Sequence, residues 1–341
     1  MSIIAEPETR KMPLKTSFSW LFLISSLAIL FLADLSMGSV RITISEIAGI
    51  LTNQKDTDAV LRDIILDFRL SKAVTCILSG GALALAGLQM QTLFRNPLAG
   101  PDVLGLSSGA SLAVSLIFMS AAAGSLFIQI ETPWTVAVAA SSGCLGVFVI
   151  MLAAARRLRD NASLLIVGLM VGAGTSSLVS ILQYMSKAEE MQVYIIWTFG
   201  SLGGLSWAEI RVLTIVLIAG ISLAVPNLKA LNAWGLGDEY AHSLGINLRR
   251  SRFYIILSTS ILTGGVTAFC GPIAFVGLAV PHLVKLVVRT GNHKILIPAV
   301  LTGGACLLLV CDIIAQLPGD YVLPLNAITA MIGAPVVIWV V

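Results

Sequence analysis

The sequence carries little charge. It has 21 Lys and Arg and 18 Asp and Glu, which is 11% of its 341 residues, whereas a soluble globular domain carries about 25%. This number of charges is too small to cover the surface of a soluble domain of this length. The composition therefore excludes ordinary cytosolic enzymes, nucleic-acid binders and disordered regulators. The net charge of +3 is too small to indicate a nucleic-acid partner.

Motifs for chemistry are also missing. The sequence has no GxxxxGK[ST] phosphate loop, no HExxH pair and no CxxC pair. Its five cysteines lie within or beside apolar runs, where cysteine is a small core residue, and we expect no metal site. An intramembrane enzyme is therefore poorly supported. Unless the spans work passively, the energy that drives this protein has to come from another chain.

Apolar residues, by contrast, make up 57% of the chain. A crossing takes about 20 apolar residues, so this content allows about nine or ten crossings. We predict an all-α, polytopic membrane helical bundle. The predicted spans are residues 18–38, 71–93, 104–125, 134–155, 163–184, 208–226, 253–270, 273–288, 295–314 and 321–340. Paired glycines such as Gly80-Gly81 and Gly303-Gly304 favour close helix packing.

Basic residues orient the bundle. With the N-terminus inside, 14 of the 21 Lys and Arg fall in cytoplasmic loops and 7 fall outside. The positive-inside rule therefore predicts that both termini are cytoplasmic. The first apolar run follows Arg10, Lys11 and Lys15 but lacks a clear small-x-small cleavage site, so we expect a retained span.

Two polar segments interrupt the predicted single transmembrane domain, which covers residues 1–341. The outer loop, about 39–70, opens with a predicted capping box at Thr43–Glu46. Five of the seven outer basic residues lie between the first two spans, which fits either a docking surface or a solvated loop. The inner segment, about 227–252, is too polar to enter lipid and has a helical pattern of its own.

Ionisable residues are nearly absent from the predicted spans. Asp34 and Asp312 fall toward outer span ends, and we interpret both as structural or interfacial. The histidines, His242, His282 and His293, map to the inner side. Ion-coupled carriers keep ionisable residues near mid-membrane, so this distribution disfavours the alternative of a self-contained secondary transporter.

Turn-forming residues follow the second span. Pro97 and Pro101 cannot continue a helix from the preceding turn, but Pro101 is suited to begin the next one. Asn96 can bond to backbone groups freed at the turn. Gly105 and Gly109 then permit close packing of the third span.

Similar residues lie near the end of the chain. Gly271 and Pro272 predict an outer turn, and Pro281 disrupts a helix near the inner face. Gly333 and Pro335 are expected to loosen or bend the last span. We interpret His282, beside Pro281, as a hydrogen-bonded residue of the inner face.

A short helix is predicted in the inner segment. Gly237 precedes two acids, Asp238 and Glu239, which favour a helix N-terminus. Ala241 and Leu244 share a face, and Gly245 can end the helix. Such a helix under the bundle is either a structured loop or a contact that transmits motion from a soluble motor.

Four stretches together closely resemble one family, the FecCD-type permeases, which are the membrane subunits of ABC importers for ferric siderophores, haem and cobalamin. They are Arg95–Ala110 (RNPLAGPDVLGLSSGA), Leu236–Gly245 (LGDEYAHSLG), Gly271–His282 (GPIAFVGLAVPH) and Thr329–Pro335 (TAMIGAP). The resemblance covers essentially the whole chain and implies ten spans with both ends inside.

The resemblance implies a path between two permease copies, expected here as a homodimer. The fifth and tenth spans and a short outer helix, here about 190–203, would line it. The inner gate would lie at Asn161, Ala162 and Ser163. Two ATPase subunits would dock on the segment containing Gly237, Asp238, Ala241, Leu244 and Gly245. ATP and Mg would bind those subunits, and this chain would hold no cofactor.

The resemblance also implies an outer partner, a periplasmic or lipid-anchored substrate-binding protein. Basic residues there would pair with its acidic residues, here Arg62, Arg69 and Lys72. The family's usual Arg-x-Pro-Arg is Arg69-Leu-Ser-Lys72 in this chain, so the proline is missing. Gln316 replaces a third basic residue, and Asn326 stands where the family often has glycine.

Localisation and substrate follow from the same resemblance. We expect a multi-pass protein of a bacterial inner (cytoplasmic) membrane. The expected substrate is a bulky metal chelate, with ferric siderophore favoured over haem and then cobalamin on family frequency. The sequence leaves open the substrate itself and whether the permease pairs as a homodimer or a heterodimer.

Overall fold

A computed structural model describes residues 14–38, 42–52, 59–120, 133–158, 161–235, 237–318 and 321–340. All regular structure within these ranges is helical. The elements are α1 (Leu14–Ser36), α2 (Ile44–Leu51), α3 (Ala59–Asp63), η1 (Ile64–Arg69), α4 (Leu70–Phe94), η2 (Pro101–Leu104), α5 (Leu106–Ser120), α6 (Pro133–Arg157), α7 (Asn161–Met185), α8 (Ala188–Thr198), α9 (Trp207–Ala224), η4 (Val225–Asn227), α10 (Leu228–Trp234), α11 (Asp238–Ser243), α12 (Leu248–Cys270), α13 (Val276–Val288), α14 (His293–Gln316) and α15 (Leu325–Val340).

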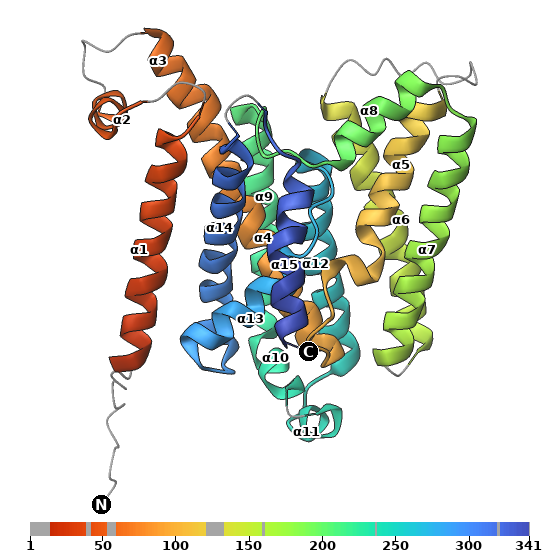
Figure 1. Cartoon of the computed structure of the whole chain (residues 1–341). Helices are drawn as coiled ribbons and strands as arrows, with labels where there is room; N and C mark the ends of the chain where they lie inside the picture. Colours follow the sequence, from red (N-terminus) through yellow and green to blue (C-terminus); the bar gives the residue numbers. More distant parts are fainter. Residues whose placement is uncertain are drawn as a thin grey trace, which may run out of the picture.

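The long helices form one bundle with small helices at its two ends (Figure 1). α2, α3 and α8 lie at one end, called the outer end below, and α10 and α11 lie at the other, the inner end. The first turn of α1 and the last turn of α15 both lie at the inner end. Among the described residues, seven helices are long and apolar enough to cross a membrane.

Each of the ten predicted spans contains an apolar helix, but three of these helices are short. α5, α13 and α15 fall below the length of the other seven. α13 has 13 residues, about 20 Å at 1.5 Å per residue, whereas the hydrocarbon core is about 30 Å thick. The eighth predicted span, 273–288, is therefore helical only from Val276 onward, after a non-helical stretch that begins at Gly271.

The centre of the bundle is α4. The helical stretch Ala59–Phe94 has 83% of its most apolar window buried, against 22% for α1. α4 packs against α9, α12, α13 and α14. At the crossing with α14, a Cβ on Gly80 would overlap the carbonyl of Gly304, so only glycine permits this approach of the two backbones.

The outer loop is shorter than predicted. Helical structure begins at Ala59 and runs through the π-helical segment η1 into α4 without a break. Arg62 and Arg69, which we expected in a loop, therefore lie on a helix. The capping box at Thr43 is confirmed: its hydroxyl accepts from the Glu46 N–H, and the Glu46 carboxylate accepts from the Thr43 N–H at 2.8 Å. The Glu46 carboxylate also accepts from the Thr43 hydroxyl at 2.7 Å. This bond and the bond from the Thr43 N–H lower the pKa of the exposed Glu46 carboxyl.

Candidate functional site

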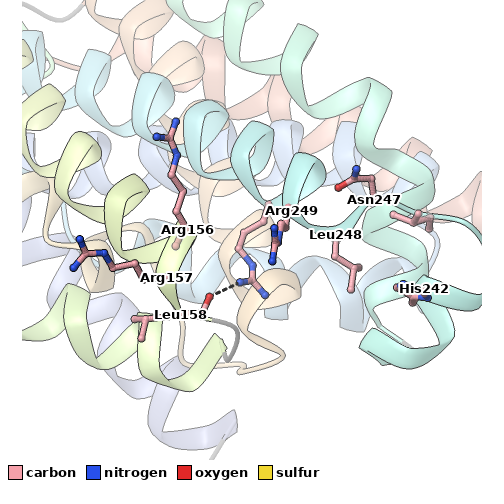
Figure 2. Close-up of a pocket in the computed structure, with 10 residues that line it drawn as sticks. Arg156, Arg157, Leu158, His242, Asn247, Leu248 and Arg249 are labelled. Atoms are coloured by element: carbon pink, nitrogen blue, oxygen red, sulfur yellow. Dashed lines mark hydrogen bonds between the residues drawn. The ribbon is translucent and has the colours of Figure 1, made fainter.

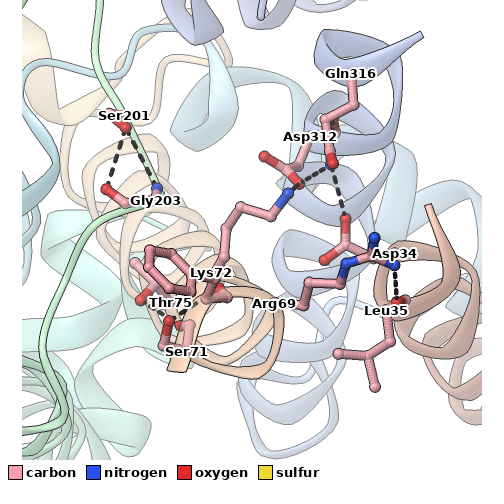
Figure 3. A network of polar contacts seen from close by, with 11 residues as sticks. Asp34, Leu35, Arg69, Ser71, Lys72, Thr75, Ser201, Gly203, Asp312 and Gln316 are labelled. Atoms are coloured by element: carbon pink, nitrogen blue, oxygen red, sulfur yellow. Dashed lines mark hydrogen bonds and ion pairs between the residues drawn. The ribbon is translucent and has the colours of Figure 1, made fainter. Parts of the chain in front are cut away.

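A polar network joins α1, α4 and α14 near the outer end (Figure 3). Lys72 Nζ lies 2.8 Å from Asp312 Oδ2. Gln316 Nε2 donates to the same Asp312 oxygen at 2.6 Å and to Asp34 Oδ1 at 3.4 Å. Arg69 Nη1 donates to the Leu35 carbonyl at 2.9 Å, and its side chain points toward Asp34. We call these five polar side chains, those of Asp34, Arg69, Lys72, Asp312 and Gln316, the outer network.

The outer network is buried and its charges balance. Arg69 is 6% exposed and Asp34 is fully buried, and the Lys72 side chain is only 16% exposed. Two cations face two carboxylates, which is the arrangement that makes buried charge tolerable. Arg69 and Lys72 thus point into the chain, whereas Arg62, the third predicted docking residue, is exposed.

Three of the buried groups nearby are potential metal ligands. Ligand atoms of Asp34, Cys76 and Asp312 lie within 4.8 Å of one another. The Lys72 ammonium already pairs with Asp312, and a divalent cation added beside it would bring like charges together in a buried place. The chemistry of this cluster therefore favours an ion-pair network, and Asp34 and Asp312 tie helices together.

At the inner end, α11 projects below the bundle (Figure 1). Ala241 is fully buried, whereas Leu244 is 57% exposed and Tyr240 is 46% exposed. Gly237 precedes the helix with φ of +117°, and Asp238 is its first residue. The exposed Tyr240 and Leu244 side chains, on either side of the buried Ala241, form a partly apolar surface. Such a surface is suited to binding a protein partner.

Gly245 ends α11 as predicted. Its φ is +74°, its N–H donates to the His242 carbonyl at 2.9 Å, and the Ile246 N–H donates to the Ala241 carbonyl at 3.2 Å. This pair of hydrogen bonds is the Schellman motif, in which glycine avoids the strain of a left-handed conformation. No other atom lies within 4 Å of the position a Cβ would take.

One face of α7 is open along its whole length. Only 17% of its apolar window is buried. The exposed residues at helical spacing are Ala162, Ile166, Ala173, Ser177, Ser180 and Tyr184. Ser177 and Ser180 donate to backbone carbonyls of their own helix, so the stripe is mildly polar without carrying charge. The predicted gate residues lie in its first turn: Asn161 begins α7, Ala162 is exposed and Ser163 is half-buried.

The last helix has a comparable face. Ala327, Met331, Pro335 and Ile338 are exposed on α15 and follow helical spacing. Gly333, on another side, packs against Phe275, and a Cβ there would overlap the Phe275 side chain. Gly333 is thus a packing residue of α15, and Pro335 belongs to the exposed face.

The whole-chain comparisons agree with this architecture. The profile of the FecCD transport family matches residues 26–341. The chain belongs to the FecCD transport family. The haemin transport system permease protein HmuU of Yersinia pestis is 34% identical, over 94% of both chains. The vitamin B12 import system permease protein BtuC of Vibrio parahaemolyticus is 37% identical, over 81% of this chain and 82% of its own.

A solved structure shares the fold of this FecCD-family chain. It is described as that of a metal-chelate type ABC transporter in an inward-facing conformation. It is 25% identical, with a TM-score of 0.82 over 95% of this chain and 99% of its own. The family and the all-helical bundle predicted from the sequence are therefore confirmed.

The first FecCD stretch forms a compact turn after α4. Asn96 Oδ1 accepts from the Leu98 N–H at 2.8 Å, Pro101 begins η2, and Gly105 follows it with φ of +72°. His282 Nε2 lies 2.8 Å from the Pro97 carbonyl. This contact attaches the turn to α13, where Pro281 lies inside the helix. Gly109 packs against Gly143 of α6.

The third FecCD stretch meets the start of α15 near the outer end. Gly271 ends α12 with φ of +73°, and Pro272 follows it. The Ala274 N–H donates to Asn326 Oδ1 at 3.2 Å, and the Asn326 N–H donates to the Phe199 carbonyl at 3.0 Å. Asn326, which departs from the family pattern, therefore ties α15 to the ends of α8 and α12.

One polar contact escaped the sequence analysis of this family member. His293 Nε2 lies 2.9 Å from Thr92 Oγ1, and its Nδ1 lies 2.9 Å from Asn232 Oδ1. The Asn232 oxygen also accepts from the His293 N–H at 2.8 Å. His293 thereby fastens α10 to α4 and α14. The sequence around His293 does not predict these contacts, because its partners are 61 and 201 residues away.

Proposed function

We propose that this chain is the permease subunit of a binding-protein-dependent ABC importer, which moves a bulky metal chelate into the cytoplasm. The observation that carries the proposal is the exposure of Tyr240 on α11 and of Leu244 directly after it. Both lie at the inner end of a chain that belongs to the FecCD family. ATP hydrolysis on two separate subunits would supply the energy. This chain would bind neither ATP nor Mg and would not be an enzyme.

Motion would enter through α10 and α11. An ATPase subunit docked on Leu244, Gly245 and their neighbours would move α11. His293 would pass that motion on, because its side chain links α10 to the buried α4. Trp234, at the end of α10, is fully buried and would help to hold α10 against the bundle.

Two copies of the chain would form the path. The exposed faces of α7 and α15 support this part of the proposal, because both are uncovered in the single chain and the α7 face adds Ser177, Ser180 and Tyr184 to its apolar side chains. The gate would lie at Asn161, Ala162 and Ser163, at the inner end of the α7 stripe. The dimer would be symmetric, a homodimer in the bacterial inner membrane.

A substrate-binding protein would dock on the outer end. Arg62 offers an exposed guanidinium there. Arg69 and Lys72 are committed to the outer network, so acidic groups of the binding protein would have to compete with Asp34 and Asp312 for them. Arg62 is therefore the first contact in this proposal, and Arg69 and Lys72 are secondary ones.

The substrate class rests on relatives. HmuU and BtuC are named for haemin and vitamin B12, and these two compounds are bulky metal chelates. Ferric siderophore, our expectation from family frequency, belongs to the same class. We carry all three forward, with haem as the first substrate to test because HmuU aligns over 94% of both chains.

Reconstitution tests the proposal. The permease would be placed in proteoliposomes with its ATPase, and its binding protein would be supplied outside. Uptake of labelled haem, ferric siderophore or cobalamin should require ATP in the compartment that holds the ATPase. ATP-independent uptake that follows a proton or sodium gradient would overturn the proposal in favour of a secondary transporter.

A further inference from the structure

A basic cavity lies at the inner end of the bundle, between the end of α6 and the start of α12 (Figure 2). Its volume is about 550 Å³. Its polar lining comes from Arg156, Arg157, Arg249, Arg252, Asn247 and His242. We call these six residues and the space between them the basic cavity.

The described lining of the basic cavity carries cations and no carboxylate. None of the described residues that line it is an Asp or a Glu. Within the described ranges, Arg156, Arg157 and Arg249 make no ion pair with an Asp or Glu, and all three are exposed. Arginine presents a planar fork of donors that matches a phosphate, so the cavity is suited to a phosphate anion.

One wall of the cavity is fixed. Arg252 is 7% exposed, and its Nη1 donates to the Leu158 carbonyl at 3.3 Å, across from α12 to the end of α6. The Arg250 guanidinium, just outside, lies 5.6 Å from the centre of the Tyr254 ring. These contacts position part of the basic surface before any ligand arrives.

Two further hollows follow α6 and α12 beyond the cavity, and we call them together the α6–α12 groove. A second hollow of about 440 Å³ shares Arg156 and Arg249 and adds Leu152 and Phe253. A third, of about 200 Å³, is lined farther along by Phe148 and other apolar residues of the same two helices. The lining residues of both hollows follow helical spacing, on α6 Leu145, Phe148 and Leu152, and on α12 Phe253, Leu257 and Ile261.

The length of this groove fits one leaflet. From Arg249 to Ile261, α12 rises about 18 Å at 1.5 Å per residue, and half of the hydrocarbon core is about 15 Å. A basic end and an apolar continuation of that length match an anionic headgroup and an acyl chain. Basic pockets at the cytoplasmic ends of membrane helices recognise anionic lipid headgroups by this chemistry.

We propose that the basic cavity binds the phosphate headgroup of an anionic phospholipid of the inner leaflet, with one acyl chain in the α6–α12 groove. The assignment takes its membrane side from the proposed function but needs neither transport nor an ATPase. Because Arg252 holds Leu158, three residues before α7, the lipid would brace the helices on either side of the proposed gate.

Lipid retention tests the site on the purified full chain. Detergent-washed protein would be titrated with phosphatidylglycerol and with phosphatidylcholine of the same acyl chains, and bound lipid would be counted by native mass spectrometry. We expect retention of phosphatidylglycerol to exceed that of phosphatidylcholine. Arg156→Gln with Arg249→Gln should lower it about thirtyfold, in line with the attraction of each of the two surface cations for anionic lipid.

A matched control removes the same charge elsewhere on the inner end. Arg289 and Lys294 are exposed and lie outside the cavity and the groove, so Arg289→Gln with Lys294→Gln should leave phosphatidylglycerol retention unchanged. Equal loss in both double variants, or equal retention of the two lipids, would overturn the site. A blocked groove gives a second check, since Leu145→Trp should weaken retention of long-chain but not of dihexanoyl phosphatidylglycerol.

Two other occupants are separated by the same experiment. Complete displacement of the lipid by millimolar inorganic phosphate would identify a free-anion site and overturn the lipid assignment. Basic-cavity variants that retain phosphatidylglycerol but no longer copurify with the ATPase would identify a protein contact at the cavity. That result would also overturn the lipid assignment. Normal lipid retention with no ATP-dependent uptake would instead contradict only the proposed function.

Discussion

The two ends of the molecule use basic residues in opposite ways. At the outer end, the half-buried Lys72 pairs with the buried Asp312, which also accepts from Gln316. At the inner end, Arg156 and Arg249 are exposed, and none of the described residues that line their cavity is acidic. The outer network pairs its cations within the chain, whereas the exposed arginines of the basic cavity have donors available to other molecules.

Burial explains the difference. A charge removed from water needs a partner at close range, because the interior does not solvate it. An exposed arginine is hydrated at little cost and keeps its donors for a ligand.

The largest expected effect comes from breaking the buried pair. Asp312→Ala leaves the Lys72 ammonium without its carboxylate and removes an acceptor of Gln316. We expect a loss of about 3 kcal/mol of stability, measured by reversible unfolding of the purified chain in mixed micelles. Asp67→Ala is the matched control, because the Asp67 side chain is exposed and makes no ion pair with the other described residues.

A double variant sharpens the interpretation. Asp312→Leu combined with Lys72→Met removes both charges and keeps apolar volume, so it should recover most of the stability lost by Asp312→Ala. If the double variant is as unstable as the single one, the cause is lost packing, and the charge pairing proposed for the outer network is wrong.

The second effect concerns the open inner end. Leu244→Glu puts a charge where the proposed ATPase contact is apolar, and we expect the affinity for the ATPase to fall at least tenfold, as for a central interface residue. The measurement is copurification followed by titration of the ATPase. Leu244→Met keeps an apolar side chain and should bind normally, whereas full binding by Leu244→Glu would remove α11 from the interface.

Much of the fold was predictable from the sequence. Apolar runs located the long helices, and local signals gave the capping box at Thr43 and the glycine-terminated helix at Gly245. These features depend on residues within five positions of one another. The family motifs added the short outer helix, expected near 190–203 and observed as α8.

Features that join distant residues were not predictable in the same way. Lys72 and Asp312 are 240 positions apart, and neither local sequence predicts that the two side chains form an ion pair. The loop expected at 39–70 is partly helical because η1 continues the apolar packing of α4, with Ile65 fully buried. The predicted docking, gate and coupling roles remain predictions, since they concern partners outside this chain.

The third effect separates exposed from buried basic residues at the outer end. Arg62→Glu should weaken binding of the substrate-loaded binding protein by roughly tenfold through lost attraction and added repulsion. Lys72→Met should change that affinity less, because Lys72 already pairs with Asp312. Binding-protein affinity in nanodiscs measures both. A larger effect at Lys72 would mean that docking opens the outer network.

The smallest effect distinguishes the two ends by salt alone. Exposed charges are screened when the Debye length falls from about 10 Å at 0.1 M to about 3 Å at 1 M, whereas buried pairs are screened much less. Raising the salt over that range should lower phosphatidylglycerol retention at the basic cavity several-fold. The stability difference between the wild-type chain and Asp312→Ala should stay nearly constant. Equal salt sensitivity at both ends would show that water reaches Lys72 and Asp312, and the contrast between a closed outer end and an open inner end would fail.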